Sequence, residues 1–207
     1  MPLVIFMRHG QADNNVQRML VGRHLESHLT EQGRKQVADA AADLKNVQID
    51  RVVVSPVIRA VETAEIICKE IGANYEVDER LYEIELGKLV GMNYDEVVSK
   101  YGDLFLKFYD EHDPALESFG IESFTSVKKR VKSLLDEAAE MHTERNILCV
   151  THLDPIKAAI STILDLNPVA LYRWHIRNAS MTILRQDSKN YSLSGVNVMS
   201  MNRYPLE

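Results

Sequence analysis

A short apolar run near the start of the chain ends in an arginine and a histidine. Residues 3–7 read Leu-Val-Ile-Phe-Met and are followed by Arg8, His9 and Gly10. A continuous apolar run of this length is typical of a buried strand, and open α/β folds bind ligands at the carboxyl ends of such strands. Gly10 lacks a Cβ, so it allows a sharp turn and lets a charged group approach the backbone. The run therefore predicts a ligand-binding site at the end of the first strand.

Further segments supply partners for this site. The apolar residues 52–54 lead into the segment 55–64, which carries Arg59. The segment 81–87, Leu-Tyr-Glu-Ile-Glu-Leu-Gly, contains Glu83, and the apolar residues before Thr151 lead into His152. Together with Asn15 and with Glu122-Ser123 ahead of a long helix, these motifs in this order resemble the histidine phosphatase superfamily. The resemblance is to the branch that includes the cofactor-dependent phosphoglycerate mutases, and it covers nearly the whole chain.

The residue types suit phosphoryl transfer. A phosphomonoester carries up to two negative charges, so a nucleophile reaches phosphorus only where cations and N–H donors neutralise the oxygens. Arg8 and Arg59 can supply such donors at any working pH. His9 is the expected nucleophile, since a neutral imidazole has a free lone pair once an acceptor holds its other nitrogen. His152 is expected to donate to the phosphoryl oxygens, either protonated or through one N–H.

Glu83 is the expected proton donor to the leaving alkoxide. A carboxyl that acts as an acid at neutral pH needs a pKa raised by burial or by nearby negative charge. The order Leu81-x-Glu83 before Gly87 and Gly91 matches how the family presents its acid/base glutamate. The alternative is that Glu83 and Glu85 are both surface carboxylates. We expect Glu85 to be solvated.

The resemblance also implies substrate contacts from Asn15, Gly22 and the backbone N–H of Leu153. Leu153 stands where the family usually has glycine, and a leucine does not easily take a positive φ. We therefore expect an ordinary backbone geometry after His152.

Length and composition fit one α/β domain. The chain has 207 residues, 45% of them hydrophobic and 26% charged, which allows a single domain over residues 1–207. Alternating strands and helices predict a mainly parallel sheet with right-handed crossovers. The family fold is likewise a three-layer arrangement in which helices cover both faces of the sheet.

The expected elements follow from the apolar spacing and the capping residues. Thr30 is the expected N-cap of the first long helix, Ser55-Pro56 and Gly72 bound the second, and Asp154 should cap the last. Strands are expected near residues 3–8, 51–55, 75–78, 146–151, 179–185 and 191–198, and helices near 31–45, 56–72, 123–141 and 155–165.

The segment of about residues 92–122 interrupts this alternation. It carries aromatic side chains interleaved with acids: Tyr94, Tyr101, Phe105, Phe108, Tyr109 and Phe119. In the family, such an insertion folds over the active site as a lid and shapes the substrate pocket. The simpler interpretation is two short amphipathic helices that pack on the core, and both interpretations can hold together.

Net charge and hydropathy indicate which classes of partner this protein is not expected to bind. The net charge of −6 argues against a nucleic-acid substrate, because no basic run offsets phosphate repulsion. We expect neither a membrane span nor a signal peptide, and a cytoplasmic location. Cys68 and Cys149 are expected to be small buried apolar residues without a disulfide. The segment 173–177 either forms a second anion site or is a strand flanked by solvated charges.

Departures from the mutase pattern favour hydrolysis over isomerisation. Mutases hold the substrate carboxylate and second phosphate with a tyrosine, a lysine and an arginine pair, where this chain has Leu86, Tyr94 and the acidic Asp110-Glu111. The insertion is also shorter, and Val21 replaces the threonine usual before Gly22. We therefore expect a phosphatase of small phosphorylated metabolites that needs no cofactor. The alternative is a mutase dependent on 2,3-bisphosphoglycerate.

Two other classes remain as alternatives. His24 and His28 stand four residues apart, a spacing that binds metals on a helix, but Gly22 and Thr30 bracket this segment as a loop, and no metal is expected. Some members of the family have lost the histidine and serve as binding modules. The presence of His9 and its partners argues against that function here.

Overall fold

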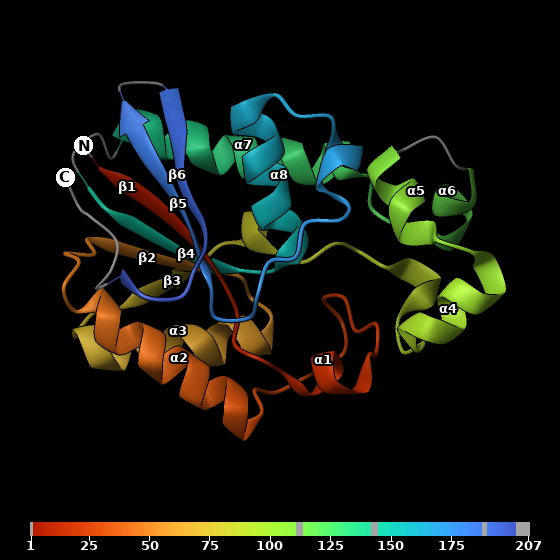
Figure 1. Cartoon of the computed structure of the whole chain (residues 1–207), viewed down its shortest axis with the longest axis horizontal. Helices are drawn as coiled ribbons and strands as arrows, with labels where there is room; N and C mark the ends of the chain where they lie inside the picture. The colour runs from red at the N-terminus through yellow and green to blue at the C-terminus, as the bar shows by residue number, and fades with distance from the viewer. Residues whose placement is uncertain (1, 111–113, 142–144, 188–189, 202–207) are drawn as a thin grey trace.

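Six strands form one sheet at the centre of the protein (Figure 1). The computed structural model describes residues 2–110, 114–141, 145–187 and 190–201. In sheet order the strands are β3 (Tyr75–Val77), β2 (Arg51–Val54), β4 (Ile147–Thr151), β1 (Leu3–Arg8), β5 (Met181–Asp187) and β6 (Asn190–Val198). The first four pair in parallel, and β5 and β6 add an antiparallel edge. The predicted mainly parallel sheet is confirmed.

Helices cover both faces of this sheet and make three layers (Figure 1). On one face, α2 (Glu31–Leu44) and α3 (Ile58–Ile71) pack on Ile5 and Met7 of β1. On the other, α7 (Phe124–Met141) and α8 (Leu153–Leu164) pack on Val4 and Phe6. Because both faces of β1 are buried, its sequence is a continuous apolar run rather than an alternating pattern.

Local signals set most helix ends, with two exceptions. The Thr30 side chain accepts from Gly33 N at 2.9 Å, as expected of an N-cap. Gly72 ends α3 at φ 71°. However, α3 begins at Ile58 rather than at Pro56, and His152 rather than Asp154 is the N-cap of α8. Asp154 therefore lies in the first turn of α8, where its side chain accepts a hydrogen bond from the Tyr109 hydroxyl.

The insertion forms three short helices rather than two. They are α4 (Tyr94–Tyr101), α5 (Leu104–Asp110) and α6 (Pro114–Phe119), and they lie together beside the α7–α8 layer (Figure 1). Phe108 and Tyr109 pack edge-on or tilted against Phe124 of α7, with ring centroids 5.5 and 5.1 Å apart. The insertion is thus anchored to the core by aromatic contacts.

The remaining elements are short. A five-residue helix, α1 (Asp13–Gln17), follows β1, and three 3-10 turns occur at η1 (Glu79–Leu81), η2 (Gly87–Leu89) and η3 (Pro168–Leu171). Residues 173–177 form a loop, so the prediction of a strand there was wrong. Cys68 and Cys149 are buried and free, as predicted. Among the described residues, the helices are all too short or too polar to cross a membrane.

Candidate active site

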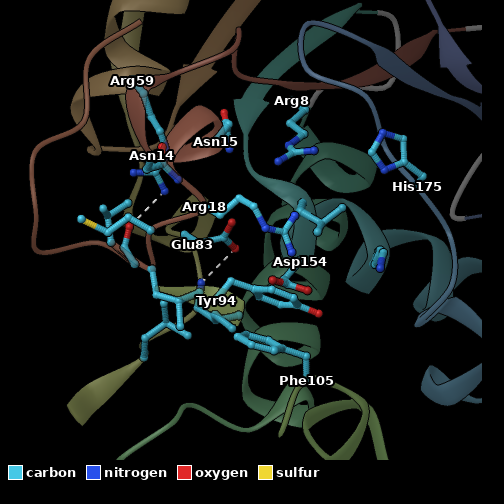
Figure 2. Close-up of a pocket in the computed structure, with 18 of the residues that line it drawn as sticks. Arg8, Asn14, Asn15, Arg18, Arg59, Glu83, Tyr94, Phe105, Asp154 and His175 are labelled. Atoms are coloured by element: carbon cyan, nitrogen blue, oxygen red, sulfur yellow. Dashed lines mark hydrogen bonds between the residues drawn. The ribbon is translucent and has the colours of Figure 1, made fainter. Parts of the chain in front are cut away.

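The carboxyl ends of three adjacent strands meet beside a pocket of about 450 Å³. His9 follows β1, Ser55 follows β2 and His152 follows β4, and the two imidazole rings lie 5.2 Å apart. The predicted residues Arg8, Asn15, Gly22, Arg59, Glu83 and Leu153 all line the pocket. His9 and His152 are buried next to it, so the structure brings all eight predicted site residues together. Figure 2 shows Arg8, Asn15, Arg59 and Glu83 around the pocket.

Hydrogen bonds fix the tautomer of His9. Its Nδ1 lies 2.7 Å from Gly10 O, which can only accept, and Arg59 Nε donates to its Nε2 across 3.1 Å. Nδ1 therefore carries the proton and Nε2 holds the lone pair. Burial above all, and then the charges of Arg59 and Arg8, hold the pKa of His9 well below its usual range. The imidazole is neutral at pH 7.

Gly10 is required for a different reason from the one expected. A Cβ at this position would come within 2.7 Å of the Val37 side chain and 2.8 Å of Gly33 O, both in α2. The turn after His9 is thus pressed against a helix backbone rather than kept open for a ligand. Thr63 Oγ1 accepts from Gly10 N, and Asn178 Nδ2 donates to His9 O, which further fixes this turn.

Arg8 and Arg59 place buried cationic donors at the pocket. Arg8 Nη1 donates to Ile176 O at 2.5 Å, and Arg59 Nη2 donates to Gly22 O at 3.0 Å. Arg8 Nε and Arg59 Nη1 are buried and have no hydrogen-bond partner in the described part of the chain. Burial lowers the pKa of Arg59 to about 10, so both groups stay charged at pH 7. A buried charged donor without a partner is costly, so these atoms indicate an anion site.

His152 is neutral rather than cationic. Burial, followed by the charge of Arg59, holds its pKa well below the usual value. Its Nε2 lies 2.8 Å from Ser55 Oγ, and Val57 N already donates to that oxygen. If the Ser55 hydroxyl donates to Nε2, the proton of His152 is on Nδ1, which has no partner among the described residues. His152 can then present one N–H to an anion, the second of the two states expected from the sequence.

Glu83 lies after η1 with its carboxyl pointing into the pocket (Figure 2). Burial and then the charge of Asp154 raise its pKa to about 7, against the opposing effects of Arg59 and Arg8. Ile84 N donates to Oε1 at 3.1 Å. A carboxyl in this environment is poised between its acid and base forms near neutral pH.

Arginines hold the loop that carries Glu83. Arg23 Nε donates to Glu83 O, and Arg23 and Arg130 both form ion pairs with Glu122 at 2.6 and 3.0 Å. Glu122, part of one recognised motif, therefore acts on the position of Glu83. Glu85 is partly solvated, with its side chain 27% exposed, and it also accepts from Gly87 N at 2.9 Å and pairs with His24 at 2.5 Å.

The histidines suggested as metal ligands contact different carboxylates. His24 pairs with Glu85, and His28 pairs with Glu62 at 2.9 Å. Both lie in a loop, as the bracketing residues predicted. The described residues contain no cluster of three or more groups able to hold a metal.

The far side of the pocket differs in part from the prediction. Leu86 and Tyr94 line it, at the positions where the mutases are expected to have a tyrosine and a lysine, and Asp110 ends α5. Glu111 lies outside the described residues. However, the basic residues Arg18 and Lys157 also line the pocket, together with His175, and the comparison with the mutase pattern did not identify them. Of the basic segment 173–177, His175 is the residue that lines the pocket, which gives no sign of a separate second anion site.

A family model, the histidine phosphatase superfamily (branch 1), matches residues 4–199. The chain belongs to this superfamily. A 2,3-bisphosphoglycerate-dependent phosphoglycerate mutase of Thermoplasma acidophilum is 36% identical over 186 residues, which cover 89% of this chain and 87% of the relative. Phosphoserine phosphatase 1 of Hydrogenobacter thermophilus is 28% identical, with 94% and 92% covered.

Two solved structures have the same fold as this chain. YhfR of Bacillus stearothermophilus matches with a TM-score of 0.87 and 26% identity, covering 97% of this chain and 99% of the other. A mycobacterial glucosyl-3-phosphoglycerate phosphatase with bound VO3 matches with a TM-score of 0.85 and 27% identity, covering 96% and 100%. A mutase and phosphatases are therefore both among the proteins that this member of the superfamily resembles.

Several residues of the site were missed in the sequence. Tyr109 OH donates a hydrogen bond to Asp154 Oδ1 inside the pocket wall, and Lys157 lies one turn further along α8. The Ser55 contact with His152 and the Asn178 contacts with the His9 turn were missed as well. A lysine in the otherwise apolar run 155–160 was the one signal that could have pointed to Lys157.

Proposed function

We propose that this protein is a phosphomonoesterase that hydrolyses small phosphorylated metabolites through a phosphohistidine on His9. The observation that carries the proposal is a neutral imidazole with its lone pair on Nε2, next to buried arginine donors that lack protein partners. That combination suits an incoming phosphoryl group, since the donors neutralise its oxygens while the lone pair attacks phosphorus.

The reaction proceeds in two steps. In the first, Nε2 of His9 forms a bond to phosphorus, the ester P–O bond breaks, and protonated Glu83 gives its proton to the leaving alkoxide. In the second, water attacks the phosphohistidine, Glu83 takes a proton from that water, the P–N bond breaks and inorganic phosphate leaves. Arg8, Arg59 and one N–H of His152 stabilise the charge on the phosphoryl oxygens.

The remaining predicted residues act in binding. Asn15, Gly22 and the Leu153 backbone N–H lie along the pocket and supply contacts to the substrate. Leu153 begins α8 with helical geometry, so its N–H belongs to the first turn of a helix, where backbone donors are open to an anion. The insertion of about residues 92–122 serves as a lid, an assignment supported by Tyr94, Phe105 and Tyr109 in the pocket wall.

Phosphoglycerate mutase activity is the second candidate. It is favoured by the 36% identity to the Thermoplasma acidophilum mutase and by Lys157, Arg18 and His175 in the pocket. A mutase transfers the phosphoryl group from His9 to the free hydroxyl of a bound phosphoglycerate instead of to water. His9 then takes the other phosphoryl group from the resulting bisphosphoglycerate. The phosphatase remains our first candidate because Leu86 and Tyr94 stand where the mutases have cationic or bisphosphate-gripping residues.

One experiment separates the two. Phosphorylated metabolites are screened for phosphate release, and 3-phosphoglycerate is followed with and without 2,3-bisphosphoglycerate, with His9→Asn as the inactive control. We expect phosphate release to exceed 2-phosphoglycerate formation. If isomerisation is tenfold faster or more, a difference of about 1.4 kcal/mol in barrier height, the protein is a mutase. If no phosphomonoester reacts, the catalytic proposal is wrong.

We also propose a cytoplasmic location. The two free, buried cysteines support it, because a reducing compartment keeps thiols unpaired.

A further inference from the structure

A buried lysine lies in the pocket wall and has no part in the reaction described above. Lys157 is 2% exposed and lines the pocket from the second turn of α8. Lysine is almost never this buried unless it is paired. Its Nζ donates to Tyr172 O at 3.2 Å and lies 4.8 Å from the ring centroid of Tyr109. In the described ranges this is its one hydrogen bond, and an ammonium has three donors.

A carboxylate accompanies the lysine on the same face of α8. Asp154 precedes Lys157 by three residues, and side chains at this spacing are neighbours on a helix surface. Asp154 also lines the pocket, and the Tyr109 hydroxyl from α5 donates to its Oδ1. The Asp154 carboxylate, an acceptor, and the Lys157 ammonium, a cation, therefore lie side by side in the pocket wall. Figure 2 shows the position of Asp154.

Their position along α8 corresponds to the leaving-group end of the substrate. His152, proposed to contact the phosphoryl group, is the N-cap, and Lys157 is five residues later, about 7.5 Å along the helix axis. Helical side chains lean toward the N-terminus, so the ammonium is brought closer to the phosphate site than its Cα. The charges of Arg8 and Glu83 both act on the pKa of Lys157, which agrees with this proximity. Because Glu83, Asp154 and Lys157 line the same pocket, the part of the substrate beyond the ester oxygen is the part within reach of Lys157.

We infer that Lys157 and Asp154 form a subsite for a carboxylate that bears an adjacent hydroxyl or ammonium group. Lys157 donates to the carboxylate, and the free oxygen of Asp154 accepts from the neighbouring hydroxyl or ammonium. The substrate class is then a short phosphorylated hydroxy acid or amino acid. This inference rests on the proposed phosphatase function of the same pocket.

The test uses substrates that differ in one group. 3-Phosphoglycerate and glycerol 3-phosphate of matching configuration differ only by a carboxylate in place of a hydroxymethyl group. We expect the wild-type kcat/KM to be at least tenfold higher for 3-phosphoglycerate. Lys157→Met keeps the length of the side chain without its charge, and it should remove this preference by lowering kcat/KM for 3-phosphoglycerate at least tenfold more than kcat/KM for glycerol 3-phosphate. Lys132→Met, at an exposed position of α7 paired with Asp136, is the matched control.

The role of Asp154 is tested in the same way. 3-Phosphooxypropionate lacks the hydroxyl of 3-phosphoglycerate but keeps its carboxylate. Wild type should prefer 3-phosphoglycerate, and Asp154→Asn should reduce that ratio. Because both substrates undergo the same chemistry, any effect of the substitution on Glu83 cancels in the ratio.

The outcomes distinguish this inference from the proposed function. Equal loss on both members of the first pair in Lys157→Met would mean that the lysine only positions Tyr109 and Tyr172, and would overturn the inference. A wild type that hydrolyses phosphomonoesters without preference for the carboxylate also overturns it, even if the variants do not fold. If the wild type hydrolyses no phosphomonoester, the proposed phosphatase function is wrong. The subsite can still be tested by calorimetry, which compares the binding of 3-phosphoglycerate and of glycerol 3-phosphate to the His9→Asn variant.

Discussion

The Nε atom of Arg59 donates a hydrogen bond to Nε2 of His9 across 3.1 Å. This contact occupies the lone pair that the proposed nucleophile must use. An incoming phosphoryl oxygen is a stronger acceptor for a guanidinium than a neutral imidazole nitrogen, so we expect it to take over this donor. Substrate binding would then both hold the phosphate and free the nucleophile. The Gly10 carbonyl keeps the other nitrogen protonated throughout.

We predict that phosphate is attached to Nε2 of His9 during turnover. The hydrogen bond from Nδ1 to Gly10 O leaves Nε2 as the nitrogen with an available lone pair. Brief incubation with a phosphate-labelled substrate, followed by an alkaline quench and peptide mapping, should place an acid-labile, alkali-stable label on this atom. Label on His152 or on a serine, or no label during active turnover, would contradict the prediction.

Glu83→Gln should slow turnover by roughly 10²- to 10⁴-fold, the range typical of a positioned proton donor. The loss should be smaller for nitrophenyl phosphate than for alkyl phosphates, since a nitrophenolate leaves without a proton. Steady-state kinetics with the two classes of ester checks this. Glu85→Gln is the control from the same loop and should cost much less, because Glu85 pairs with His24 away from the reacting atoms. Equal losses of turnover on nitrophenyl and alkyl phosphates would show that Glu83 is not the proton donor to the leaving group.

The pH dependence should follow the raised pKa of Glu83. Its pKa of about 7 means that the acid form is lost as the pH rises through 7, so kcat/KM for alkyl phosphates should fall above that pH. The charge of Asp154 contributes to this raised pKa. Asp154→Asn removes that charge and should move the alkaline limb of the profile to lower pH. Asp165→Asn, at the other end of α8, is the control and should leave the limb in place.

The strand ends could be predicted because burial on both faces gives continuous apolar runs, as in residues 3–7 and 147–150. Arg8, His9 and His152 could therefore be identified as site residues from their positions directly after these apolar runs. Tyr109 and Asp154 could not be paired in advance, because 45 residues separate them and nothing local indicates that α5 packs on α8. The pairing of Glu85 with His24 was missed for a similar reason, because 61 residues separate the two.

Gly33 in α2 gives a prediction that reverses the usual effect of a helical glycine. Replacement of glycine by alanine in a helix normally stabilises a protein by about 0.5–1 kcal/mol. Here a Cβ at Gly33 would lie 1.9 Å from Gln11 O, in the turn that follows His9. Moving that backbone should cost more than the propensity gains, roughly 1–3 kcal/mol as for other overpacked sites. Gly33→Ala should therefore lower both the free energy of unfolding and the turnover rate.

Urea unfolding and phosphatase assays check this prediction, with Gln32→Ala as the control. Gln32 is the exposed neighbour of Gly33 in the same helix, so its replacement should change the free energy of unfolding little and leave turnover intact. The loss of turnover in Gly33→Ala follows because the turn supplies the Gly10 carbonyl that fixes the tautomer of His9. An increase in the free energy of unfolding on Gly33→Ala would contradict the prediction, because it would mean that the turn after His9 can move at little energetic cost. The orientation of His9 would then depend on its contacts with Arg59 and Asn178 instead.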